Sequence, residues 1–142
     1  MGLRDEILAL AREHGGKEIA PGADDDLLGA FGMEGDDAAE FLEAFADRFG
    51  VELSGLLPYF HYVEDARQRR PRVYPVAPDG ARLPMRPITL ADLVAAAEAG
   101  RWTLSYPPHE LREAIGAKIK RWLVVGFFLA VLLLWTWTRV AR

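Results

Sequence analysis

Hydrophobic side chains recur at helical spacing in three stretches of the first hundred residues. The shared faces consist of Leu3, Ile7 and Leu10 in residues 3–14, of Ala38, Phe41, Leu42, Phe45 and Phe49 in residues 31–53, and of Leu90, Leu93, Val94 and Ala97 in residues 89–99. A period near 3.6 residues places each set on one side of a helix. The pattern therefore predicts three amphipathic helices, each with one face to bury.

The helix within residues 31–53 has a start signal and a stop signal. Asp37 and Glu40 have the spacing of a capping box, and Gly50 supplies a C-terminal stop because it has no Cβ. We therefore expect this helix to start at Asp37 and to end at Gly50.

The side of this helix opposite its aromatic face is acidic. Its members are Asp36, Glu40, Glu43 and Asp47. Two pairs of like charges four residues apart cost a few tenths of a kcal/mol each, so the stripe lowers helix stability. Either it is a solvated face that aids solubility, or it binds a partner.

The helix at residues 89–99 also has a start signal and a stop signal. Thr89 and Asp92 form a second capping-box pattern, and Gly100 is the stop. Trp102 follows at once, and we expect it to close the core beside this helix; an exposed tryptophan that binds a partner is the alternative.

An uncharged run, Trp122–Thr138, is the strongest hydrophobic signal in the chain. Its composition gives roughly −3 to −6 kcal/mol of membrane-insertion free energy. A chain of this size cannot surround such a helix with its own core, so the run predicts a transmembrane helix over residues 122–140. The aromatic residues expected to contact the membrane are Trp122, Phe127, Phe128, Trp135 and Trp137.

Between these helices the chain is rich in proline and charge. Residues 63–86 hold four prolines, which exclude a regular helix. They also hold an arginine cluster, Arg67, Arg69, Arg70 and Arg72. The cluster could fold against the protein's own acidic helix, stay solvated or contact an anionic membrane surface. Without a basic fold around it, it does not predict nucleic-acid binding.

The sequence predicts no metal, cofactor or catalytic site. Residues 24–26 suggest a calcium loop within an irregular segment at 15–30, but Leu28 and Gly35 stand where oxygen ligands belong. The zinc pattern that would begin at His109 fails because Glu113 replaces its second histidine. There are no cysteines. We therefore do not expect an enzyme.

Residues 31–53 resemble an acyl carrier protein. The matching residues are Phe31–Asp37, then Glu40 and Phe41, and finally Phe49–Leu53. In that family the serine of an Asp-Ser-Leu segment bears the phosphopantetheine arm, and Gly35 occupies its position here. The resemblance implies a helical domain that cannot carry cargo. It also implies that an acidic helix face docks basic partner proteins.

A second segment resembles a bacterial family of short proteins of unknown function. The matching residues are Pro87–Leu90, Leu93–Val94 and Ala97–Trp102. Together the two resemblances imply an all-α fold, an acyl-carrier-like small helical bundle. We divide the chain into an acyl-carrier-like domain at 1–62, a loop or linker at 63–86, an accessory helix packing on the domain at 87–104, a charged stalk at 105–121 that begins a helix near Pro108, and the transmembrane helix at 122–140.

Charge and composition suggest where the protein resides. Residues 1–55 hold 4 basic and 14 acidic side chains, so most of the 17 basic residues lie in the rest of the chain. Lys118, Lys120 and Arg121 precede the span, whereas Arg139 and Arg142 follow it. With no N-terminal signal pattern, we expect a single-pass protein of the bacterial inner membrane with its N-terminal domain in the cytoplasm.

The leading hypothesis is a tail-anchored, non-carrying interaction module that binds the basic surface of another protein through Asp36, Glu40, Glu43 and Asp47. One alternative is a membrane-anchored carrier that uses Ser54 or Ser105. Another is a structural subunit of a membrane complex, with Gly126 permitting close approach of another helix.

Overall fold

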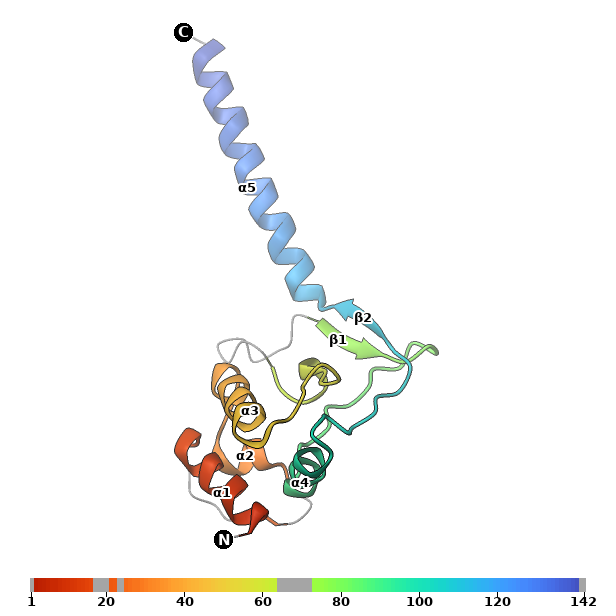
Figure 1. Cartoon of the computed structure of the whole chain (residues 1–142). Coiled ribbons are helices and arrows are strands. Elements are labelled where there is room, and N and C mark those ends of the chain that lie inside the picture. The colour runs from red at the N-terminus through yellow and green to blue at the C-terminus, as the bar shows by residue number, and fades with distance from the viewer. Residues whose placement is uncertain (1, 17–20, 23–24, 64–72, 141–142) are drawn as a thin grey trace.

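The computed structural model describes residues 2–16, 21–22, 25–63 and 73–140. Its elements follow in the order α1 (Leu3–His14), α2 (Leu27–Phe31), α3 (Asp36–Phe49), the 3₁₀ helix η1 (Pro58–Phe60), β1 (Val73–Val76), α4 (Leu90–Ala99), β2 (Glu110–Glu113) and α5 (Ile115–Val140). Helices α1–α4 form a bundle at one end of the molecule, α5 projects from the other, and the two strands lie between them (Figure 1).

The bundle buries the hydrophobic faces that the sequence predicted. Its fully buried large side chains include Ile7, Leu10, Phe41, Phe45 and Leu93. Helix α1 packs against α2, α3 and α4, so all four helices share one core. Burying three such phenylalanine or leucine side chains contributes roughly 5–9 kcal/mol before chain entropy is counted.

The ends of α3 and α4 are joined by backbone hydrogen bonds. The Glu52 N–H donates to the Gly100 carbonyl oxygen at 3.0 Å, and the Trp102 N–H donates to the Glu52 carbonyl oxygen at 2.8 Å. Both helices end as predicted, at Gly50 and Gly100 in the left-handed conformation. These bonds place Trp102, 5% exposed, in the core rather than on the surface.

The start of α3 differs from the prediction. The helix begins at Asp36, its N-cap is Gly35, and no side chain caps it, so the capping box expected from Asp37 and Glu40 does not form. The predicted loop at 15–30 also overlaps α2, which begins at Leu27. Its N-cap is Asp26, whose carboxylate accepts from the Gly29 N–H at 3.2 Å. By contrast, the capping box of Thr89 and Asp92 is confirmed at α4.

The expectation of an all-α fold is wrong, because β1 and β2 pair as an antiparallel two-stranded sheet. Val73 lies opposite Glu113, and Val76 opposite Glu110. The strands fall in the segments expected to be a linker and a helical stalk. Pro75 excludes a helix but is tolerated here, since both strands of a two-stranded sheet are edge strands.

The helix expected from Pro108 onward begins only at Ile115. From there α5 runs without interruption for 26 residues, about 39 Å. Its stretch Lys118–Val140 is long and apolar enough to cross a membrane, and none of its most apolar window is buried inside the protein. This stretch of membrane length therefore extends beyond the uncharged run at 122–138 at both ends.

Candidate functional site

The acidic stripe predicted on α3 lies on the protein surface. Asp36, Glu40, Glu43 and Asp47 are all exposed, whereas the opposite side of the helix is buried in the core. We call these four residues the acidic face. They extend along about 17 Å of one rigid helix, so their carboxylates are held at fixed spacing.

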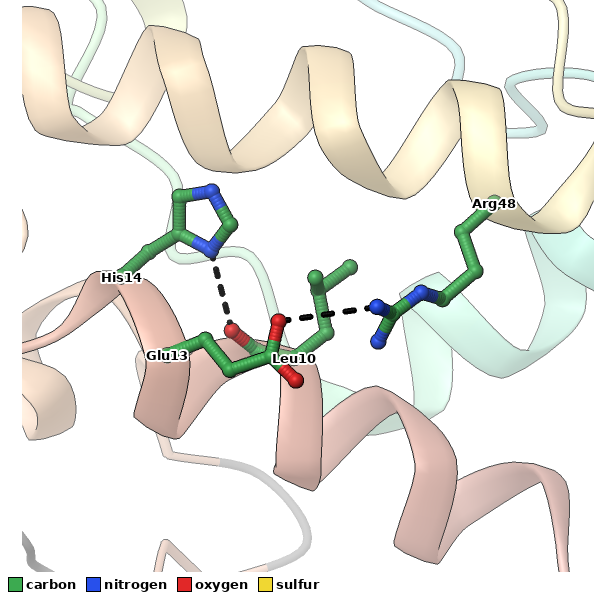
Figure 2. Close-up of polar contacts among 4 residues, drawn as sticks. All are labelled: Leu10, Glu13, His14 and Arg48. Carbon is green, nitrogen blue, oxygen red and sulfur yellow. Dashed lines mark hydrogen bonds and ion pairs between the residues drawn. The ribbon is translucent and has the colours of Figure 1, made fainter.

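Within the part of the chain that the structure describes, none of the four carboxylates has a hydrogen bond or an ion pair. The single basic residue of α3, Arg48, points to the neighbouring helix, where its guanidinium lies 3.5 Å from the Glu13 carboxylate of α1 (Figure 2). His14, beside Glu13, places its Nδ1 3.1 Å from the Leu10 carbonyl oxygen. The positive charge of α3 therefore does not neutralise the acidic face.

Gly35, at the serine position of the carrier resemblance, is held in a conformation that requires glycine. It is buried, with φ 54° and ψ −118°. These angles and the bond from the Asp37 N–H to the Glu34 carbonyl oxygen (3.1 Å) match a type II′ turn, which places glycine at its first central position. A serine at this position would be strained by its Cβ, whatever the role of its hydroxyl.

The two alternative serines lie elsewhere. Ser54 is exposed beyond the C-terminal end of α3, and its N–H donates to a Glu52 carboxylate oxygen at 3.2 Å. Ser105 is also exposed, and its carbonyl oxygen accepts from Arg86. Neither serine lies at the start of a helix, which is the setting that the carrier resemblance implies. The arginine cluster at 67–72 lies outside the described residues.

The membrane-facing residues predicted on α5 are exposed on all sides of an otherwise bare helix. Trp122 is 71% exposed and Trp137 is 74% exposed, and Phe127, Phe128 and Trp135 are exposed as well. Near the C-terminal end the Arg139 guanidinium stacks over the Trp135 ring at 4.5 Å. A core helix of a soluble protein would bury such residues, whereas none of the most apolar window of α5 is buried.

A buried polar network that the sequence analysis missed joins η1 to the segment after α4. The His61 Nδ1–H donates to the Arg86 carbonyl oxygen (2.9 Å), which leaves Nε2 to accept the Tyr106 hydroxyl proton (2.7 Å). The Tyr106 oxygen then accepts from the Trp102 Nε1–H (2.9 Å) and the Leu57 N–H (3.3 Å). Burial lowers the pKa of His61, although its bond to Arg86 acts in the opposite direction.

A second aromatic contact continues this network toward the sheet. The Tyr59 hydroxyl lies 2.9 Å from the His109 Nε2, whose ring also packs edge-on against Phe60. The His109 Nδ1–H donates to the Pro107 carbonyl oxygen (2.8 Å), which leaves Nε2 to accept the Tyr59 hydroxyl proton. Burial raises the pKa of the Tyr59 hydroxyl. These contacts attach the chain just before β2, and therefore α5, to the bundle. No local pattern in the sequence signals them, since Tyr59 and His109 are 50 positions apart.

A small cavity of about 200 Å³ opens between η1 and β1. Three tyrosines and five aliphatic, proline or methionine residues line it, and one basic residue, Arg82, is stacked over the Tyr74 ring at 4.6 Å. No catalytic arrangement of side chains lines it within the described residues. What it provides is an apolar hollow beside one guanidinium group.

Residues 3–105 match a family model described as "Protein of unknown function (DUF1493)". The chain belongs to the DUF1493 family. The region matched to DUF1493 contains α1–α4 and β1 and ends one residue before Tyr106, so β2 and the membrane-length helix α5 lie beyond it. No curated protein and no solved structure matches the chain.

Proposed function

We propose that this protein is a membrane-tethered interaction module. In this proposal α5 anchors it in the bacterial inner membrane, and the cytoplasmic DUF1493 domain docks a basic protein through the acidic face. The segment 31–53 serves as a non-carrying relative of the acyl carrier docking helix, with Gly35 in place of the attachment serine.

The observation that carries this proposal is the state of the four carboxylates. Their like-charge spacing costs the helix stability, and no basic side chain in the described residues offsets it. A face that is unfavourable for folding and rigidly displayed is suited to a complementary partner, which would gain on-rate and specificity from it.

Two further observations support the tether. Lys118, Lys120 and Arg121 lie at the bundle end of α5, as expected for a cytoplasmic flank. The family match ends before α5, which is consistent with a domain to which a span has been attached.

The test is affinity capture with the full-length protein purified from detergent-solubilised bacterial membranes. The variant Glu40→Lys with Glu43→Lys reverses the middle of the acidic face. The matched control, Glu6→Lys with Glu98→Lys, makes the same change in net charge at exposed positions of α1 and α4. We expect the control to retain a partner that the first variant loses and that salt releases. If the acidic-face variant recovers every protein that the control recovers, the docking proposal is refuted.

A further inference from the structure

Exposed apolar side chains that precede Trp122 lie near the sheet and on the first turns of α5. Among the described residues before Trp122, the large apolar side chains that are exposed are Met85, Leu111, Ile115 and Ile119, with exposed fractions of 50%, 49%, 74% and 54%. None of them belongs to α1–α4. Together with Arg82 we call them the sheet-side patch.

The first turns of α5 extend the apolar surface of the span toward the sheet. Ile115, Ile119 and Trp122 follow one another at spacings of four and three residues, so they form one stripe along the helix. Lys118 and Arg121 lie to one side of that stripe. An apolar stripe flanked by long basic side chains is typical of helix segments at the membrane interface.

The sheet lies close to the end of α5 that would enter the membrane interface. Only Ala114 separates β2 from α5, and the Glu113 carboxylate of β2 lies 3.6 Å from the Arg121 guanidinium of α5. The helix rises only about 10 Å from Ile115 to Trp122. That distance is close to the Debye length at physiological salt, so charged side chains on the sheet would interact electrostatically with an anionic membrane surface.

The cavity beside the sheet has the chemistry of a lipid headgroup site. Arg82 is exposed, and its stacking on Tyr74 limits the directions in which its guanidinium can point. Guanidinium groups bind phosphate through paired hydrogen bonds. Met85 and the apolar wall of the cavity would contact the glycerol and upper acyl region of the same molecule.

We propose that the sheet-side patch is a second membrane contact. Met85 and Leu111 enter the interfacial layer, and Arg82 binds the phosphate of an anionic phospholipid at the mouth of the cavity. This contact rests on the proposed function, since α5 must first cross the membrane. Because the bundle and α5 lie at opposite ends of the molecule (Figure 1), this contact would leave the bundle on the side of the sheet that faces away from the membrane.

The chain has no cysteines, so a single cysteine can carry a fluorescent label at any chosen position. We would label Met85→Cys and, as a matched exposed control on α4, Ala95→Cys, each in full-length protein reconstituted into vesicles with anionic lipid. A nitroxide on the lipid headgroup should quench the label at 85 severalfold more than the label at 95. Equal quenching at the two positions would overturn the proposal.

A third label separates failure of the patch from failure of the span. A fluorophore at Ala130→Cys, in the middle of α5, should be quenched by a nitroxide on the lipid acyl chain. Quenching at 130 without quenching at 85 refutes the patch alone. No quenching at 130 refutes the tether as well.

A separate variant tests the proposed contact between Arg82 and the lipid phosphate. One basic residue at an anionic surface shifts the ratio of docked to undocked domain about fivefold. Arg82→Gln should therefore reduce quenching at 85 in vesicles with anionic lipid and not in purely zwitterionic ones. Arg101→Gln, which removes an exposed arginine after α4, should leave quenching unchanged. If the two arginine variants behave alike, Arg82 does not bind lipid.

Discussion

Replacing Tyr106 with phenylalanine removes one oxygen atom that three groups share. That oxygen accepts from Trp102 Nε1 and from the Leu57 N–H, and it donates its proton to His61 Nε2. Phenylalanine keeps the ring, which stacks near Phe60 with centroids 4.8 Å apart, so the packing is preserved. The variant therefore isolates the hydroxyl.

The size of the effect follows from burial. Trp102 is 5% exposed and His61 is 6% exposed, so neither can replace the lost bond with bulk water. Leaving a buried polar group unpaired costs about 1–3 kcal/mol, and two such groups give about 3 kcal/mol in total. The Leu57 N–H is only partly buried and adds little. For a domain of this size, such a loss lowers Tm by roughly 10–20 °C.

The assay is urea denaturation of the full-length protein in detergent. Three of the four tryptophans lie on α5, so replacing them with phenylalanine leaves Trp102 as the only tryptophan reporter of the core. The control is Tyr74→Phe, since the Tyr74 hydroxyl makes no hydrogen bond among the described residues; we expect a change below about 0.5 kcal/mol. If Tyr106→Phe is no more destabilising than Tyr74→Phe, the network does not stabilise the fold.

Three other changes test separate parts of the structure. Because burial lowers the pKa of His61, the unfolded chain takes up a proton at a higher pH than the folded protein does. The free energy of unfolding should therefore be highest above about pH 6.5 and decrease below it. His61→Asn should flatten this dependence in denaturation curves from pH 7 to 5. Gly35→Ser should destabilise the domain by about 1–3 kcal/mol in urea denaturation, because the φ angle of Gly35 is positive. The control Gly16→Ser, at a position with no neighbouring atoms, should be nearly neutral. Equal effects of the two variants would show that the turn at Gly35 tolerates a side chain. Leu129→Asp with Leu132→Asp adds roughly 6–8 kcal/mol to the insertion free energy of α5. It should move the protein from the alkali-washed membrane pellet to the soluble fraction, where the unaltered chain should not appear.

Helices with strong local signals were predictable from the sequence. Residues 3–14 are α1, and α4 begins with the predicted capping box and ends at Gly100. These features depend on side chains a few positions apart. The acidic face follows from the same periodicity, because the buried phenylalanines of α3 fix which side of the helix is exposed.

The sheet could not be predicted because its second strand has no pattern of its own. Residues 110–113, Glu-Leu-Arg-Glu, are all exposed and become a strand only by pairing with β1. The hydrogen bonds of Tyr106 are hidden from sequence reasoning for a similar reason, since His61 is 45 positions away. The start of α3 was mispredicted because Asp37 and Glu40 have capping spacing, while the backbone at Gly35 already turns without a side-chain cap.

The single residue between β2 and α5 restricts where a bound protein can be. A domain on a long flexible linker samples a large volume above the bilayer. The effective concentration of its binding face therefore decreases as the linker lengthens. Here Ala114 leaves no slack, and the ion pair of Glu113 with Arg121 spans the joint. If α5 crosses the membrane as proposed, a protein bound to this domain would diffuse in two dimensions at a nearly constant height, and rotation of α5 about its axis would turn the bound protein with it.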